Sequence, residues 1–517
     1  MANTTLFRSF LGALMPPANA RNEEGATAYA LTAEQALAQF AATGCLNTTF
    51  YASDVTQLDR VTALAERVSP EFIAKVALYC RDRGHMKDMP ALLLALLSRR
   101  DPQLMDGVFD RVVDSPRMLR TFVQIVRSGA AGRKSLGSTP KRCVRRWLDG
   151  RSDEAVFAAA VGNSPSVADV VRMVHPKPGT AAREALYGYL IGRPVDPDKL
   201  PAIVRQFEAF KRDRDRDVPD VPFQMLTALD LDRPAWTAIA RRASWQMTRM
   251  NLNTFARHGV FEDRDMVDRI AARLRDRSEI DRARVFPYQL LAAFRAAGDD
   301  VPAAIRSALE DAMELAISNV PAIEGQVYVC PDVSGSMQSP ITGVRKGATT
   351  AVRCVDVAAL VSAAVLRRNP TAEVLPFEID VVPVRLSARD SVMTNAERLA
   401  AVGGGGTCVS APLAQLNARK AAGTLVIVVS DCESWADASP ARGTATMREW
   451  ETFRARNPGA RLVLIDLQPY STTQASERAD ILNVGGFSDQ VFSVIADFAA
   501  GRLHANHWFG QIDAVAI

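Results

Sequence analysis

The sequence predicts two architectures in one chain: an all-helical region up to about residue 320 and an α/β region after it. Before this boundary, apolar residues recur at three- and four-residue spacing between Gly, Pro and Asp-Ser breaks, and strand patterns are scarce. After it, short β-branched runs alternate with helical patterns of roughly ten to fifteen residues, which is typical of βαβ units and a parallel sheet. The chain has 517 residues, 48% apolar and 23% charged, so its composition is that of an ordinary globular protein.

The helical region is expected to contain many short helices, several of which begin with Pro or Asp in the first turn. The expected helices are Leu31–Thr43, Thr56–Arg67, Pro70–Arg83, Met89–Leu97, Pro116–Gly129, Ser138–Asp149, Asp153–Val161, Ser166–Val174, Ala181–Leu190, Lys199–Arg212, Pro222–Ala228, Pro234–Arg242, Met247–Arg257, Asp263–Arg275, Pro287–Ala297 and Val301–Ile317. Such a series favours a helical-repeat solenoid of the HEAT kind, although no fixed sequence period is visible.

The α/β region is expected to form a doubly wound parallel sheet. Its expected strands are Gln326–Cys330, Glu373–Phe377, Thr424–Ser430 and Arg461–Leu467, and its expected helices are Arg353–Arg368, Asn395–Val402, Ala411–Ala422, Thr444–Arg456 and Ser488–Ala500. The predicted domains are therefore an N-terminal extension (1–21), a helical module (22–320) and an α/β domain (321–517).

Three polar clusters follow strands of the α/β domain, where open parallel sheets bind ligands. Asp332, Ser334 and Ser336 follow the first strand, Thr407 follows a run of four glycines, and Asp431 ends a third strand. Carboxylates, hydroxyls and water make an all-oxygen shell that suits Mg²⁺ better than zinc or copper. The alternative is a Ser/Gly turn that only caps a helix.

A basic stretch marks the helical region. From Arg117 to Trp147 there are nine Lys and Arg residues and no acidic one, and such a field attracts polyanions. The residues expected to contact phosphates lie in a Gly-rich loop (Arg133 and Lys134) and in the helix after it (Lys141, Arg142, Arg145 and Arg146). The alternative is a solvated helix face.

The remaining composition favours a soluble cytoplasmic protein. Residues 1–320 carry a net charge of +6 and residues 321–517 a net charge of −2. The seven cysteines include no C-x-x-C pair, so neither a disulfide framework nor a zinc knuckle is indicated. No window approaches the roughly 20 apolar residues of a membrane helix.

The motifs resemble those of a known family. The D-x-S-x-S, Thr and Asp pattern is similar to the metal-ion-dependent adhesion site of von Willebrand factor A (vWA) domains, and a helical module before such a domain resembles the Ro autoantigen proteins, whose helical part is the TROVE module. The matching pieces are Tyr51 after Gly44, Gly132–Gly137, Lys141–Trp147, Arg172–Pro178, Arg284–Pro287, Asp332–Met337 and Gly405–Thr407.

The resemblance implies a ring of HEAT-like helices closed by the vWA domain. Ser334, Ser336 and Thr407 would bind Mg²⁺ directly, and Asp332 and Asp431 would act mainly through water. The outer rim would bind small noncoding Y RNA, and single-stranded 3′ ends of misfolded or decaying RNA would enter the central hole. In bacterial members, Y RNA can link the protein to an exoribonuclease.

Some positions depart from the family pattern. Animal members carry further basic residues and a His where this chain has Ala158–Ala160 and Ser164–Ser166. The expected Y RNA footprint therefore shifts toward Lys141–Arg146 and Lys177, and His175 is either an RNA contact or a buried or capping residue.

The sequence thus predicts a noncatalytic, monomeric RNA-binding protein that acts in RNA quality control and stress survival as a ribonucleoprotein. One alternative is a metal-dependent nuclease, which is disfavoured because two-metal chemistry needs several carboxylates around ions roughly 3.5–4 Å apart. Only Asp332, Asp431 and Glu433 are available at these strand ends. The other alternative is a vWA domain that binds an acidic protein partner, with no role for RNA.

Overall fold

The computed structural model describes residues 16–43, 46–162, 165–283, 287–317, 320, 322–344, 352–436, 443–486, 489–503 and 507–517. Residues 1–15 of the predicted extension, and Gly44 and residues 284–286 of the family motifs, lie outside the described residues. The chain forms two compact units. The α/β unit contains residues up to Val68, Ile280–Ala296 and Leu309–Val515, and the helical unit contains Ser69–Glu279, Ala297–Ala308 and Ala516–Ile517.

The helical unit is a succession of short helices, as predicted. They are α4 (Pro70–Asp82), α5 (Asp88–Arg100), α6 (Pro102–Val112), α7 (Pro116–Ser128), α8 (Ser138–Asp149), α9 (Asp153–Ala158), α10 (Val167–Val174), α11 (Ala181–Leu190), η1 (Pro197–Lys199), α12 (Ala202–Arg212), α13 (Phe223–Leu226), α14 (Arg233–Arg242), α15 (Trp245–Met250), α16 (Leu252–Arg257), η2 (Val260–Glu262) and α17 (Arg264–Arg275). Helices α18 (Arg277–Ala283) and α20 (Ala303–Ala316) contribute to both units.

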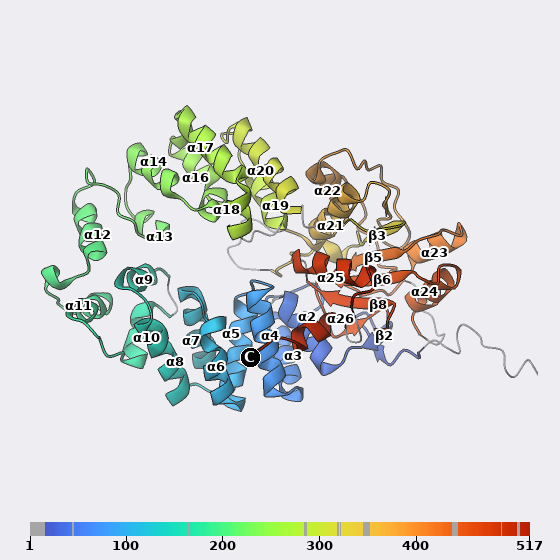
Figure 1. Ribbon diagram of the computed structural model, residues 1–517, viewed down its shortest axis with the longest axis horizontal. Coiled ribbons are helices and arrows are strands. Elements are labelled where there is room, and N and C mark those ends of the chain that lie inside the picture. The colour runs from blue at the N-terminus through green and yellow to red at the C-terminus, as the bar shows by residue number, and fades with distance from the viewer. Residues whose placement is uncertain are drawn as a thin grey trace, which may run out of the picture. The chain divides into compact units, whose positions relative to one another are not determined.

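Helices α4 to α8 stack in pairs (Figure 1). Helix α4 packs against α5 and α6, α5 also packs against α7, and α6 packs against α8. Contacts between a helix and its next-but-one neighbour are typical of helical repeats. The predicted all-helical architecture is confirmed, and the HEAT assignment and ring closure stay predictions.

Helix α6 (Pro102–Val112) is absent from the sequence-based prediction. Only Asp101 separates it from the end of α5. The Asp101 side chain caps the new helix by accepting a hydrogen bond from the Leu104 backbone N–H at 2.9 Å, and Pro102 occupies the first helical position. Its core side is apolar, with Met105 and Phe109 fully buried. The two helices are thus separated by a single capping residue rather than by a loop.

The α/β unit is built on a five-stranded sheet with the order β4-β3-β5-β6-β8, in which every neighbouring pair is parallel. The strands are β3 (Val327–Pro331), β4 (Glu373–Val374), β5 (Leu425–Ser430), β6 (Arg461–Asp466) and β8 (Ile481–Gly485). Its helices are α2 (Ala33–Thr43), α3 (Asp54–Arg67), α19 (Pro287–Ala296), η4 (Ser336–Gln338), α21 (Cys354–Arg368), α22 (Val392–Ala400), α23 (Ala411–Ala418), α24 (Ala445–Arg456), α25 (Asp489–Ala499) and α26 (His507–Asp513). The predicted parallel sheet is confirmed, with β8 as an additional strand.

Alternating side chains of the central strands enter different layers of the core. Tyr328, Val426 and Leu462 share one buried cluster with Trp450 and Phe453 of α24. Helix α21 packs against β3 and β5 and is buried along nearly its whole length. Strands buried on both faces explain why the sequence shows continuous apolar runs rather than alternation.

Residues up to Val68 belong to the α/β unit. The predicted division instead placed residues 22–68 in the helical module. Strands β1 (Ala20–Arg21), β2 (Thr27–Ala30) and β7 (Thr472–Thr473) form a small antiparallel sheet in which Tyr29 is paired with Thr473. Helix α2 packs against β8. These pairings join segments more than 400 positions apart, and no local pattern indicates them.

No helix among the described residues is long and apolar enough to cross a membrane.

Candidate metal site and basic surface

The carboxyl ends of β3 and β5 bring four of the five predicted metal-site residues together. The Asp332 side chain accepts hydrogen bonds from the Ser334 backbone N–H at 2.9 Å and from the Ser430 hydroxyl at 2.6 Å. The hydroxyls of Ser334 and Ser336 lie 3.3 Å apart, and Asp431 directly follows Ser430. Alternate residues of the loop after β3 therefore present oxygen atoms to one place, as the spacing predicted.

The glycine run before Thr407 packs closely against this loop. The Gly335 N–H donates to the Gly405 carbonyl at 2.8 Å. Gly403 has φ 85°, and a Cβ there would lie 2.3 Å from the Val333 carbonyl oxygen. Only glycine allows this approach. Thr407, which follows the glycines, is buried, and its carbonyl accepts hydrogen bonds from the loop after β5, at the Trp435 backbone N–H at 3.1 Å and the Ala436 backbone N–H at 3.0 Å.

The site concentrates buried negative charge. Asp332 is 0% exposed and Asp431 is 2% exposed. Burial raises the pKa of both carboxyl groups, and the charge of Asp431 raises the pKa of Asp332 further. A cation bound among these oxygens would offset both effects, so the donor set fits Mg²⁺. In the described part of the chain, no three His, Cys, Asp or Glu side chains form a metal cluster, so a metal site here depends on hydroxyl ligands.

The structure adds a third buried acid that the sequence argument did not assign to the site. Glu433 is 0% exposed, and its Oε2 accepts a hydrogen bond from the Glu23 backbone N–H at 2.8 Å, whereas its Oε1 has no hydrogen-bond partner in the described structure. Burial, followed by the charge of Asp431, raises the pKa of Glu433 to about 8. The Asn22 side-chain amide donates to the Ser434 carbonyl at 2.7 Å. The N-terminal segment thus covers the loop after β5.

Tyr51 reaches the same site from the loop between α2 and α3. Burial raises the pKa of its hydroxyl, the charges of Asp431 and Glu24 raise it further, and the Ser336 hydroxyl lowers it. Its ring contacts Tyr470 edge-on, with centroids 5.4 Å apart. Tyr51 was noted in the sequence only as a family motif, and nothing nearby in the sequence indicates a link to Ser336.

Two of the predicted RNA contacts are ion-paired. Arg142 lies 2.7 Å from Asp106, and Arg146 lies 2.6 Å from Asp106 and 2.8 Å from Asp110. Both acids belong to α6, which packs against α8. The Cys143 thiol and the two guanidinium groups hold the pKa of Asp106 well below its usual range. The basic stretch is therefore partly neutralised in space, although it contains no acid in sequence.

The other two cations of α8 differ. The Arg145 Nε donates to the Val174 carbonyl at 2.5 Å, and the side chain is otherwise exposed. Lys141 is half-buried, and the described structure gives it no ion pair. Lys141 is thus available to a phosphate without first breaking an ion pair.

Arg133 and Lys134 have different roles in the Gly-rich loop. The Arg133 guanidinium donates to the Ser98 carbonyl at 3.1 Å and to the Leu136 carbonyl at 2.8 Å. The bond to Ser98 holds the loop onto α5 and the bond to Leu136 lies within the loop, so Arg133 has a structural role. Lys134 is exposed, with its aliphatic chain beside Gly129.

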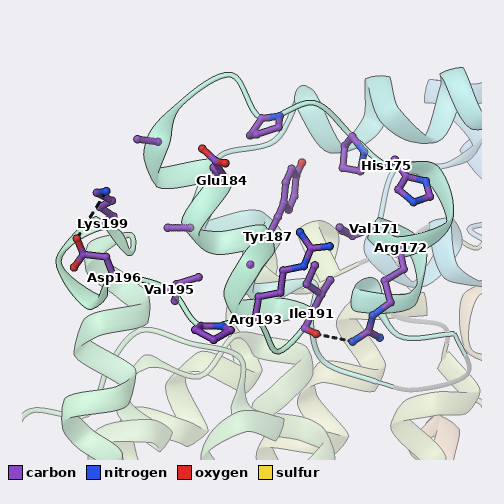
Figure 2. Close-up of a pocket in the computed structure, with 16 residues that line it drawn as sticks. Val171, Arg172, His175, Glu184, Tyr187, Ile191, Arg193, Val195, Asp196 and Lys199 are labelled. Atoms are coloured by element: carbon purple, nitrogen blue, oxygen red, sulfur yellow. Dashed lines mark hydrogen bonds and ion pairs between the residues drawn. The ribbon is translucent and has the colours of Figure 1, made fainter.

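His175 and Lys177 lie in the loop after α10, and both are exposed. His175 ends α10 in the left-handed conformation with φ 50°, and its backbone N–H donates to the Val171 carbonyl at 2.9 Å. It is therefore a capping residue through its backbone, while its ring lines a pocket of about 580 Å³ between α10, α11 and η1 (Figure 2).

Comparison with known proteins finds relatives in sequence and in structure. The family model described as the Ro60 vWA domain matches residues 326–499. A curated relative, the RNA-binding protein RO60 of Deinococcus radiodurans, is 25% identical over 93% of this chain and 96% of its own length. The crystal structure of the D. radiodurans RO (RSR) protein matches with a TM-score of 0.63 and 23% identity, covering 91% of this chain and all of that one.

These matches agree with the order of motifs in both parts of the chain. The metal-site residues and the sheet that carries them lie within the matched domain, and the full-length relative extends the likeness through the helical unit. Residues 326–499 match the model of the Ro60 vWA domain, and the chain is similar to a bacterial Ro protein over nearly its whole length, which confirms the predicted resemblance to the Ro family.

Proposed function

We propose that this chain is a noncatalytic RNA-binding protein that binds Y RNA and structured RNAs with single-stranded 3′ tails. The observation that carries the proposal is a set of lysines for which the described residues provide no ion pair: Lys134 before α8, Lys141 in α8 and Lys177 after α10, a helix that packs against α8. The RNA-binding name of the Deinococcus relative supports the same function. Exposed cations bind phosphates without reading the base sequence.

We rank the proposed contacts by the partners that each cation already has. Lys134, Lys141 and Lys177 would bind phosphates first, and Arg145 would add a contact through its free guanidinium nitrogens. Arg142 and Arg146 would exchange their carboxylate partners for phosphates, because an exposed ion pair contributes only about 0–1 kcal/mol. Arg133 would act mainly by holding the loop, and His175 would contribute its exposed ring.

The metal site is proposed to hold Mg²⁺ or another divalent cation. Ser334, Ser336 and Thr407 would supply hydroxyl oxygens, and Asp332 and Asp431 would act mainly through water. With few charged ligands, the ion would be weakly bound and exchangeable, and a partner carboxylate would complete its shell. A nuclease role is disfavoured, since a two-metal mechanism needs several closely grouped carboxylates.

The expected biological setting is RNA quality control and stress survival. A monomeric, cytoplasmic ribonucleoprotein would bind Y RNA, and Y RNA would bridge the protein to an exoribonuclease. These roles follow from the family resemblance. Sequencing the RNA that copurifies with the protein tests them, because recovery of no small structured RNA would contradict the proposal.

A competition experiment tests the type of RNA that is bound. A hairpin with a single-stranded 3′ tail should displace its blunt counterpart and should tolerate changes in tail sequence, since single strands bind through backbone charge and stacking. An A-form duplex hides its base edges in a deep, narrow groove. Equal affinity for the two RNAs would leave only binding at the outer surface. Incubation with and without a chelator, with no RNA cleavage in either case, would exclude the nuclease alternative.

A further inference from the structure

The pocket between α10 and α11 has the size and lining of a small-molecule site. Its volume of about 580 Å³ falls within the roughly 300–1,000 Å³ of ligand pockets in proteins. Apolar side chains form part of its wall, among them Val171, Ile191 and Val195 (Figure 2). Tyr187 also lines the pocket, although its side chain is largely buried and its ring lies 5.7 Å from the Arg183 guanidinium. A flat, weakly polar group is the kind of ligand body that such a wall accepts.

Charged groups of both signs stand around this apolar wall. Figure 2 shows the Tyr187 ring between Glu184 and His175, with Arg193 extending toward the same space. Two cations at the pocket already have partners: Arg172 donates to the Ile191 carbonyl at 2.7 Å, and Lys199 lies 3.9 Å from Asp196.

Three further polar side chains at the pocket are available to a ligand. In the described residues, His175, Arg193 and Glu184 have no ion-pair partner. The left-handed backbone of His175 turns the chain at the end of α10, and its ring lines the pocket. An anion would bind the two basic groups, and N–H donors would bind the carboxylate.

We propose that this pocket binds one nucleotide, with its base between Tyr187 and Glu184 and its phosphate at Arg193 and His175. Bases stack on aromatic rings and on Arg guanidinium planes, and the Arg fork matches phosphate oxygens. Glu184 favours guanine, which presents two adjacent N–H donors on its pairing edge, over uracil. The nucleotide is either a free mononucleotide or an unpaired residue of a bound RNA, and the second case rests on the proposed function.

The chain offers a matched pair of variants to test this site. Ala181 and Ala202 are both exposed and are the first residues of α11 and α12, and only Ala181 lines the pocket. Ala181→Phe places a ring in the pocket without changing charge, and Ala202→Phe makes the same change elsewhere. A second pair, Arg193→Gln and Arg205→Gln, removes one positive charge inside or outside the pocket.

Calorimetry of the full-length protein with GMP and UMP gives the first readout. GMP should bind the wild type and Ala202→Phe more tightly than UMP does, Ala181→Phe should reduce GMP affinity about tenfold or more, and Arg193→Gln should weaken binding more than Arg205→Gln. Fluorescence anisotropy with tailed and blunt hairpins gives the second readout. If RNA supplies the nucleotide, GMP should compete with the tailed hairpin and Ala181→Phe should weaken the tailed hairpin selectively.

Each outcome bears on one of the two hypotheses. Binding of GMP without any effect on the tailed hairpin assigns the site to free nucleotides. Absence of GMP binding, together with equal RNA affinity of Ala181→Phe and Ala202→Phe, would overturn the nucleotide site while leaving RNA binding intact. A wild type that binds GMP but no RNA would overturn the proposed function and leave the pocket assignment standing.

Discussion

The proposed metal site and the basic surface were both predicted from short stretches of sequence, and their residues have different surroundings in the structure. At the metal site, Asp332, Ser334 and Ser336 are fully or almost fully buried and already in contact. On the basic surface, Arg142 and Arg146 are exposed, and acids from another helix pair with them. The fold holds the oxygen atoms of the proposed metal site in place before any ligand binds. The charge that the basic surface offers to a ligand depends instead on the acids that pair with each cation.

The difference follows from the physics of the two patterns. Buried hydroxyls and carboxylates cost free energy unless they bind each other or a ligand, so a loop that buries them constrains their geometry. An exposed cation has no such constraint, and its field is the sum over all nearby charges. A polar motif at a strand end is therefore a stronger predictor of a site than a run of like charges.

The largest expected effect is loss of the metal site. Ser334→Ala combined with Ser336→Ala should abolish binding of Mn²⁺ or Mg²⁺, because both predicted hydroxyl ligands disappear, while RNA affinity should stay within about a few-fold. Calorimetric metal titration and an RNA gel shift measure the two properties. Ser339→Ala, in the same loop, is the matched control. A large loss of RNA binding in a folded double variant would place the RNA on the α/β unit.

Removing cations from α8 should give the next largest effect. Lys141→Ala, Arg142→Ala and Arg145→Ala together should weaken RNA binding and lower the slope of log affinity against log salt by about 0.7–0.9 for each phosphate that the protein no longer neutralises. The control removes the same charge from the exposed end of α12 and the turn after it, through Lys211→Ala, Arg212→Ala and Arg216→Ala. An unchanged slope in the α8 variant would show that this stretch is a solvated helix face that does not contact RNA phosphates.

Metal affinity and RNA affinity should also differ in their dependence on pH. Because burial raises the pKa of Asp332 and Asp431, protons compete with the metal at a pH where an ordinary Asp is already ionised. Mg²⁺ affinity should therefore fall between pH 8 and pH 5.5, by up to about tenfold per pH unit for each proton displaced. RNA affinity on Lys and Arg should change little over this range. Titrations of both ligands at three pH values would contradict this reasoning if metal affinity were flat.

Much of the fold and of the candidate site could be predicted from patterns within short stretches of sequence. The strand ends and the D-x-S-x-S loop were identified because residues two positions apart share one side of an extended segment, and the sheet confirms their placement. Glu433, two positions after Asp431, was counted only among the carboxylates at the strand ends. The contacts of Tyr51 and Asn22 were not assigned, because both residues reach the site from segments hundreds of residues away. Tertiary pairing of this kind leaves no periodic signal in a single sequence.

The missed helix α6 explains why the field of the basic stretch was overestimated. The sequence-based prediction assigned no helix to residues 98–115. The structure shows a capped helix there, α6, which packs against α8. Asp106 and Asp110 thereby meet guanidinium groups 36–40 residues further along the chain. Counting charges along the sequence could not detect these pairs.

The smallest expected effect tests these pairs directly. Asp106→Asn removes a carboxylate that lies 2.7 Å from Arg142 and 2.6 Å from Arg146, so both guanidinium groups become free for phosphates. Because exposed ion pairs are weak, RNA affinity should rise only about two- to fivefold, with a steeper salt dependence. Asp110→Asn, which frees Arg146 from one of two partners, should give a smaller gain, and Asp149→Asn at the end of α8 controls for charge alone. If all three variants behaved alike, long-range charge would account for the gain, and if Asp106→Asn weakened RNA binding in a folded protein, Asp106 would be holding the two arginines in the geometry that RNA requires.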